Sequence, residues 1–235
     1  MRDVREFFDA QADDYHVRAA GMRVLHEVVA ARLSAAISGD VLSVGGLWQR
    51  AEVPAEVRLT IVDASAAMLR QGSAHLPVAR LVKADARALP LSERSFDHVV
   101  LPLILHHVAG RSASEAREGA IAVLAEARRV LRPGGTLWIS EFCVSAPLYA
   151  AERLLAPLTR RALAMAGAPL VIMHDSNFYR RALTSSHWSA PTFDVIRAPG
   201  ARPFDVVTPI IGVPWIRVPR ALYPLDLTLI HAQRE

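Results

Sequence analysis

One stretch constrains the fold of this chain more than any other. The run Val41–Val44 is mostly apolar and β-prone, and Gly45 and Gly46 follow it directly. A strand that ends in paired glycines is typical of the first strand-to-helix turn of an open α/β sheet, because glycine accepts positive φ and lets the backbone approach a ligand. Asp63 and Asp85 end the next two predicted strands. Ligands of such sheets bind beyond the carboxyl ends of the strands, so these positions predict a binding crevice.

Strands and helices alternate along the chain after this turn. Strands are predicted at residues 41–45, 57–62, 79–84, 97–104, 136–142 and 225–231, and helices at 24–33, 64–72, 112–131 and 148–166. Pro54 shortens the helix after the first strand, and Pro157 is expected to interrupt the helix at 148–166. Pro133-Gly134-Gly135 is expected to end the helix at 112–131 and to turn the chain into the next strand. The alternation implies a parallel sheet with right-handed crossovers.

Composition narrows the class of protein. With 52% hydrophobic residues among 235, the chain can bury one well-formed core. Gly167 and Pro169 break the longest apolar run, so no membrane span is predicted. The N-terminus lacks the apolar segment of a signal peptide, and the single cysteine, Cys143, permits no intrachain disulfide. We therefore expect a cytoplasmic protein.

The basic balance of the chain does not predict nucleic-acid binding. The net charge is +4 and the pI about 9.8. Lys83 is the only lysine, and the arginines are scattered, with doublets that never grow into a basic run. A nucleic-acid footprint needs clustered positive charge, so no nucleic-acid partner is expected.

Short motifs run through the first 142 residues in a specific order. They are Phe7-Phe8-Asp9 with Ala12 and Tyr15, Leu59–Ser65 with Met68-Leu69, Val82–Ala86 with Leu89-Pro90 and Ser95-Phe96-Asp97, Leu105–Val108, and Arg129–Gly135. Each motif alone is weak, but their order and spacing resemble class I S-adenosylmethionine (SAM) dependent methyltransferases. The chain is most similar to the small-molecule group that includes the ubiquinone/menaquinone C-methyltransferases.

This resemblance implies an α/β fold. The expected architecture is a Rossmann-like, seven-stranded, mostly parallel sheet with helices on both faces and a C-terminal lid insertion. The chain is then one domain, in which residues 1–37 form an N-terminal helical cap. Residues 38–142 form the nucleoside-binding core, and residues 143–235 form the lid and the last strands.

The resemblance also implies roles for the two acidic strand ends. Asp63, with Ala64 beside it, would bind both ribose hydroxyls of SAM, and Asp85 with the backbone of Ala86 would address adenine. A carboxylate suits a neutral diol or an amino group because it accepts hydrogen bonds. An ordinary capping role is the alternative for each aspartate.

Further cofactor contacts follow from the same resemblance. Gly45 and Gly46 would lie against the methionine part of SAM, and the backbone of Leu101 would lie near the sulfonium. Tyr15 would close over the bound ligand, although a packed surface aromatic is the alternative.

The first turn departs from the family pattern. An acidic residue is usual where Ser43 stands, and glycines are usual where Leu47 and Gln49 stand. Losing the acid removes a partner for the ammonium group of SAM, and Leu47 and Trp48 add bulk. Either Trp48 points away and SAM binds, or the pocket is reshaped and the chain does not methylate.

Histidines are the candidate catalytic residues. His106 and His107 follow the fourth predicted strand, where the crevice should lie, and His174 with Asp175 lies in the predicted lid. Histidine titrates in the range useful for removing a proton from a hydroxyl or an acidic carbon. A structural hydrogen bond is the alternative for each. No histidine, cysteine and carboxylate spacing predicts a metal site.

Aromatic residues in the last third of the chain suggest the substrate. They are Phe178, Tyr179, Trp188, Phe193, Phe204, Trp215 and Tyr223. Aromatic walls favour an apolar or aromatic small molecule such as a quinone, a phenol or a polyketide. The alternative is that these residues form the lid's own core or a homodimer contact.

Three hypotheses for the function remain open at this point. The first is SAM-dependent methyl transfer to such a small molecule. The second is a methyltransferase-fold enzyme that catalyses cyclisation, decarboxylation or isomerisation instead. The third is a non-catalytic partner of an active methyltransferase.

Overall fold

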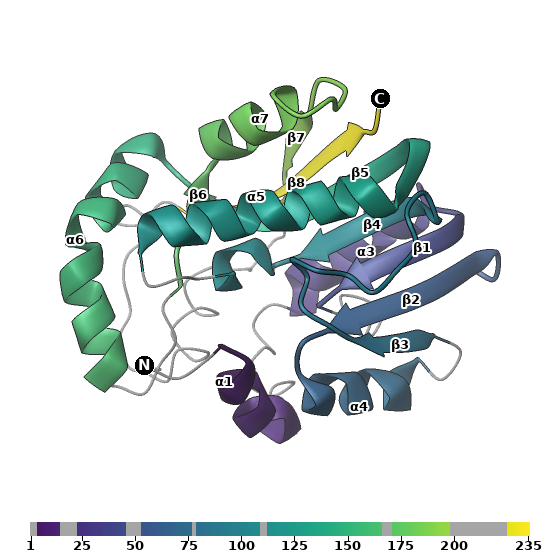
Figure 1. Ribbon diagram of the computed structural model, residues 1–235, viewed down its shortest axis with the longest axis horizontal. Coiled ribbons are helices and arrows are strands. Elements are labelled where there is room, and N and C mark those ends of the chain that lie inside the picture. Colours follow the sequence, from purple (N-terminus) through teal and green to yellow (C-terminus); the bar gives the residue numbers. More distant parts are fainter. Residues whose placement is uncertain are drawn as a thin grey trace.

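An eight-stranded mixed sheet organises the protein (Figure 1). The computed structural model describes residues 4–14, 23–45, 53–76, 79–108, 112–165, 171–197 and 225–235. The strands are β1 (Gly39–Val44), β2 (Val57–Asp63), β3 (Arg80–Lys83), β4 (Phe96–Pro102), β5 (Leu131–Val144), β6 (His174–Asp175), β7 (Thr192–Val195) and β8 (Leu225–Gln233). Their order is β3-β2-β1-β4-β5-β8-β7, and β6 pairs with β5.

The sheet reverses its strand order between β1 and β4. The chain moves outward from β1 through β2 to β3 and then returns to β4 on the other side of β1. All pairs from β3 to β5 are parallel, whereas β8 runs antiparallel to both β5 and β7. The predicted α/β class with a mostly parallel sheet is therefore confirmed, but the sheet has eight strands and not seven.

Two segments differ from the sequence-based expectation. Pro133-Gly134-Gly135 was expected to form a turn, but it lies inside β5, which begins directly after the preceding helix at Leu131. The N–H of Gly134 donates to the carbonyl oxygen of Arg234, and the N–H of Arg234 donates to that of Gly135. Pairing with the C-terminal residues thus keeps this segment extended. The strands β6 and β7 were not predicted.

The helices flank the sheet. They are α1 (Val4–Gln11), α3 (Arg23–Ser34), α4 (Ala66–His75), α5 (Ala113–Val130), α6 (Ala146–Met165) and α7 (Ser176–Thr184), with 3₁₀ turns η1 (Ala12–Asp14) and η3 (Leu105–His107). The expected interruption at Pro157 is wrong, because α6 continues through it. Pro157 is exposed, so water can satisfy the carbonyl group that loses its helical donor. Residues 53–56 are not helical and lead directly into β2.

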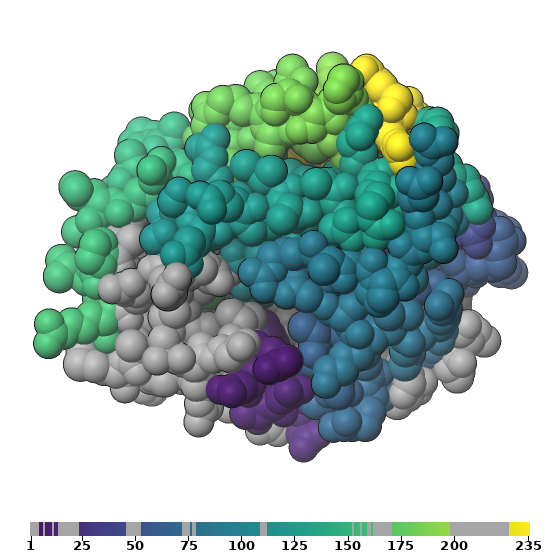
Figure 2. All heavy atoms as spheres, in the orientation of Figure 1, coloured from purple at the N-terminus to yellow at the C-terminus, as the bar shows by residue number. Residues whose placement is uncertain are grey.

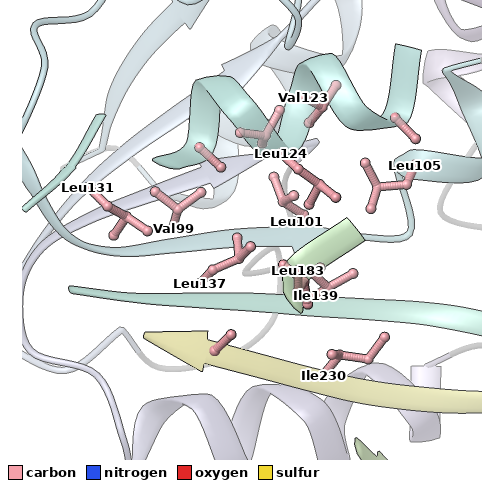
Figure 3. Packing of buried hydrophobic residues seen from close by; sticks show 14 of the residues in the cluster. Val99, Leu101, Leu105, Val123, Leu124, Leu131, Leu137, Ile139, Leu183 and Ile230 are labelled. Carbon is pink, nitrogen blue, oxygen red and sulfur yellow. The ribbon is translucent and has the colours of Figure 1, made fainter. Parts of the chain in front are cut away.

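Apolar side chains alternate between the two faces of the sheet. On one face Leu101 and Ile139 belong to a cluster with Val123 and Leu124 of α5 (Figure 3). On the other face Val100 belongs to a cluster with the buried residues of α3. This alternation is what a sheet covered on both sides requires.

Several aromatic residues of the expected lid belong to the core. Phe178, Tyr179 and Trp188 are buried in the same cluster as α5, and Phe193 packs against it. The helices α5 and α7 form adjoining bands on one face of the molecule (Figure 2). Phe204, Trp215 and Tyr223 lie outside the described residues. Among the described residues, no helix is long and apolar enough to cross a membrane.

Candidate active site at the strand ends

The carboxyl ends of β1, β2 and β4 meet at the point where the strand order reverses. Gly45 follows β1, Asp63 ends β2, and the turn η3 follows β4 after two connecting residues. Asp85 follows β3 further along the same edge. This edge is where open α/β sheets bind their ligands.

Gly45 has a conformation that only glycine adopts readily. Its φ is +88°, and its N–H donates to the carbonyl oxygen of Val62 at 2.8 Å. A Cβ atom at this position would lie 2.4 Å from Cγ2 of Ile104, the residue before η3. The glycine therefore permits β1 and the end of β4 to approach each other closely. Gly46, Leu47, Trp48, Gln49 and Tyr15 lie outside the described residues.

Asp63 is a largely buried carboxylate that forms no ion pair among the described residues, although Lys83 is its register partner on β3. Its Oδ1 accepts a hydrogen bond from the N–H of Ser65 at 2.7 Å. Burial raises the pKa of Asp63 from 3.8 to about 6, and the nearby carboxylate of Asp9 adds to this rise. Backbone hydrogen bonds from Ser65 and Ala64 oppose it. Such a group gains from hydroxyl donors that stabilise its charged form.

The helix α1 is attached to the same edge. Oδ1 of Asp9 accepts from the hydroxyl of Ser65 at 2.5 Å, and the Ser65 Oγ accepts from the N–H of Met68 at 3.0 Å. Ser65 therefore caps α4 while it holds α1. The ring of Phe8, next to Asp9, lies 4.9 Å from that of His107 in an edge-on arrangement. The N-terminal segment thus contacts both the β2 end and the β4 end of the crevice.

Asp85 is engaged by a neighbouring side chain. Its Oδ1 accepts from the backbone N–H of Arg87 at 2.8 Å, and its Oδ2 accepts from Nη2 of Arg87 at 2.6 Å. Hydrogen bonds from the Arg87 side chain lower the pKa of Asp85. The pair is exposed, with about half of each side chain accessible to solvent (52% and 47%).

A buried group of histidines follows β4. Nδ1 of His106 lies 2.6 Å from Oε2 of Glu141 on β5, and the N–H of Leu105 donates to Oε1 of Glu141 at 2.7 Å. The side chain of Glu141 is 0% exposed and that of His106 8%. The ring of His107 lies 4.0 Å from that of His106. Burial and the neighbouring His106 lower the pKa of His107.

His174 joins this group from the last third of the chain. The strand β6 pairs with β5 at Cys143, just beyond the residues of β5 that pair with β4, so β6 continues the line of β4. The N–H of Ile172 donates to the carbonyl oxygen of His106, which ties the two segments together. The ring of His174 stacks on Phe178 at 4.1 Å, and neither ring nitrogen has a partner among the described residues. Burial lowers the pKa of His174 to about 4.

Asp175 does not pair with the adjacent His174. Its Oδ1 accepts from the N–H of Phe178 at 2.9 Å and so caps α7. The structure therefore brings His106, His107 and His174 to one end of the sheet, while Asp175 serves the next helix.

Residues 40–139 match a protein family described as a methyltransferase domain. This segment of the chain is thus similar to a methyltransferase domain. Of the curated relatives, a demethylmenaquinone methyltransferase from Renibacterium salmoninarum is 32% identical over 103 residues, 44% of this chain and 40% of that protein. One from Beutenbergia cavernae is 31% identical over 134 residues, 45% of this chain and 52% of that protein. The chain thus spans about half or less of these relatives.

Solved structures share the fold of this chain over nearly its whole length. The DhpI–SAH complex has a TM-score of 0.65 at 16% identity and covers 99% of this chain and 95% of that one. A SAM-dependent methyltransferase from Thermotoga maritima has a TM-score of 0.62 at 14% identity and covers 99% and 100%. At these identities the likeness establishes the fold.

The residue of the candidate site that the sequence analysis missed is Glu141, two residues beyond the matched segment. The signal was an acid inside an otherwise apolar strand, in the run Ile139-Ser140-Glu141-Phe142-Cys143. Leu101, by contrast, is fully buried in the core, and its backbone pairs with Ile139. No group of three histidine, cysteine or acidic residues in the described part of the chain is arranged to hold a metal ion.

Proposed function

We propose that the chain is a SAM-dependent methyltransferase whose cofactor lies at the strand-order reversal, with its ribose hydroxyls on Asp63. The observation that carries this proposal is the largely buried Asp63 carboxylate, which accepts backbone hydrogen bonds and forms no ion pair among the described residues. A ribose diol would supply two hydroxyl donors to that carboxylate. The methyltransferase domain over residues 40–139 supports the same cofactor.

The other proposed contacts follow along the same edge. The methionine part of SAM would lie near Gly45, beside the end of β4 at Leu101. Adenine would lie at Asp85 and the backbone of Ala86. Arg87 occupies both oxygens of Asp85, but an exposed ion pair contributes only about 0–1 kcal/mol, so adenine could replace it at small cost.

We assign the role of proton acceptor to His106. Bound SAM supplies a sulfonium that donates its methyl group, so the protein mainly has to align donor and acceptor. A base is needed only when the acceptor atom is protonated before transfer. Of these three histidines, only His106 has a ring nitrogen within hydrogen-bond distance of a described carboxylate, that of Glu141. Burial lowers the pKa of both His107 and His174.

The acceptor we propose is an aromatic, quinone-type or polyketide-like small molecule. The names of the curated relatives support a quinone-type acceptor, because they refer to demethylmenaquinone. The phenol, quinol or enol of such a molecule carries a proton that has to leave, which suits a histidine at the end of β4.

Calorimetric titration of the full chain with SAM and with S-adenosylhomocysteine tests this proposal. Asp63→Asn should weaken binding by about 10- to 150-fold, since a hydrogen bond to a charged group contributes about 1.5–3 kcal/mol. Asp97→Asn is the matched control, because Asp97 lies at the opposite, amino end of the strands and should leave SAM affinity unchanged. Absence of binding at millimolar SAM would contradict the proposal.

A second candidate is acid–base catalysis on the same fold without methylation. The pairing of Asp85 with Arg87 favours it, because this pair leaves the adenine position occupied by protein. The His106–Glu141 pair also needs no SAM to exchange a proton. A methylated product in an assay with SAM and an acceptor of the proposed class would eliminate this candidate.

A further inference from the structure

Glu141 is the most completely buried charged side chain at this end of the sheet. It lies on β5 with 0% exposure, and a buried carboxylate is costly unless hydrogen bonds satisfy it. Its two oxygens have separate partners from one turn, because Oε1 accepts from the N–H of Leu105 at 2.7 Å and Oε2 lies 2.6 Å from Nδ1 of His106. Two consecutive residues of η3 therefore fix both the position and the orientation of this carboxylate.

We propose that Glu141 is a positioning residue that fixes the tautomer of His106, so that Nε2 is the atom that accepts a proton from the methyl acceptor. The proposal rests on the proposed function. A carboxylate only accepts hydrogen bonds, so Nδ1 of His106 must carry the hydrogen in the short contact with Oε2. In a neutral imidazole the other nitrogen, Nε2, then holds the lone pair.

Three other titratable side chains near Glu141 are buried, and Asp175 and Arg117 lie near one of them, His174. His174 faces Glu141 from β6, and Tyr179 and Cys143 lie on the same side of the sheet. Burial lowers the pKa of His174 to about 4 and raises that of Cys143 to about 11, and it raises the pKa of Tyr179 as well. These three side chains are therefore neutral near pH 7. Because Oε2 of Glu141 lies 2.6 Å from Nδ1 of His106, its carboxylate can stabilise a positive charge that forms on His106.

The proton and the electron pairs that move during methyl transfer define the class of acceptor. The proton of an acceptor O–H or acidic C–H moves to Nε2 of His106, and the electron pair left behind forms the new bond to the methyl carbon. Bound SAM would supply the methyl carbon and keep on sulfur the electron pair of the bond that breaks, and the His106 imidazolium would later release its proton to solvent. An amine with a free lone pair does not need this base. The geometry thus favours a phenol, a quinol or an enolisable carbon.

Glu141→Gln tests the tautomer directly, because glutamine keeps the shape but has one oxygen and one NH₂ group. If the amide oxygen accepts from the Leu105 N–H, the NH₂ group faces Nδ1 of His106 and moves the ring hydrogen to Nε2. We expect ¹⁵N spectra of histidine-labelled protein without SAM to show Nδ1–H in the wild type and Nε2–H in Glu141→Gln. The signal is assigned with His106→Gln.

The same variant has an expected kinetic signature. Loss of an oriented base should lower kcat by about 10²- to 10⁴-fold. The KM for the acceptor and the SAM affinity by calorimetry should change by less than about threefold, since neither ligand binds Glu141. A merely structural role would instead lower the yield of folded protein and leave the tautomer of the folded fraction unchanged.

Glu126→Gln is the matched control. Glu126 on α5 also accepts from a backbone N–H, that of Leu89 at 2.7 Å, and from a side chain, that of Arg129 at 2.7 Å. This variant should cost stability but leave the His106 tautomer and kcat unchanged.

Each remaining outcome separates the two proposals. Nε2–H on His106 in the wild type overturns the role of Glu141 even if Glu141→Gln does not fold. An unchanged tautomer or a kcat within threefold in the folded variant overturns it as well. If the wild type fails to bind SAM, the proposed function fails, while the tautomer result still decides what Glu141 does to His106.

Discussion

Replacing Asp63 by asparagine is expected to make the protein more stable and a poorer SAM binder. Burial raises the pKa of Asp63 from 3.8 to about 6, so the folded protein holds a proton that the unfolded chain releases. The free energy of unfolding therefore falls as the pH rises from about 4 to about 6 and stays lower above that range. A difference of about two pKa units corresponds to roughly 3 kcal/mol. Asparagine carries no charge and keeps an oxygen for the Ser65 N–H.

Urea denaturation at pH 4 and pH 8 measures this effect. Asp63→Asn should be more stable than the wild type by up to about 3 kcal/mol at pH 8, and the difference should largely disappear at pH 4. Asp97→Asn should show no gain at pH 8, because it removes the carboxylate that Arg132 binds. A variant no more stable than the wild type at pH 8 would refute the burial argument.

SAM binding adds a second, opposite dependence on pH. Ribose hydroxyls stabilise the ionised carboxylate, so SAM binding should release a proton near pH 6, and affinity should fall about tenfold per pH unit below it. Calorimetry in two buffers of different ionisation enthalpy counts that proton. Affinity that does not change between pH 5 and pH 7 would refute the contact between SAM and Asp63.

Three further substitutions test the surrounding structure by urea denaturation. Gly45→Ala should cost about 1–3 kcal/mol, because φ is +88° and the new Cβ would lie 2.4 Å from Ile104; Ile104→Ala should relieve only the steric part. Ser65→Ala should cost about 1–2 kcal/mol, since the N–H of Met68 loses its cap; a neutral result would contradict the capping role. Asp40→Asn should lose stability at pH 7 but not near pH 2, because hydrogen bonds from two arginines lower the pKa of Asp40 to about 2; equal losses at both values would contradict the ion pair.

Local patterns predicted most of the fold. The glycine turn after β1 and the apolar periodicity of α5 depend on neighbouring residues, and both were found from the sequence. The prediction of a turn at residues 133–135 was wrong because the pairing that keeps this segment extended comes from Arg234, about a hundred residues away. Contacts of that range leave no trace in a short window of sequence.

The site was only partly accessible from the sequence for a similar reason. His106 and His107 could be found because they follow a strand at the expected crevice. Glu141 stood out only as an acid in a mostly apolar run, because its role depends on β5 extending past the end of β4 and on which face the side chain occupies. Phe178 and Tyr179 suggested the wall of a substrate pocket, but both side chains are buried in the core cluster.

The short strand β6 brings a residue from the last third of the chain to the candidate site. The match to a methyltransferase domain ends at residue 139, before Glu141. His174 lies further along the chain, on β6, which pairs with β5 just beyond the end of β4. The proposed SAM contacts of Gly45, Asp63 and Asp85 and the proposed base His106 thus lie in the matched segment, whereas Glu141 and His174 lie beyond it. Grafting a different C-terminal third onto the same first 139 residues should change the choice of acceptor and leave the proposed SAM contacts in place.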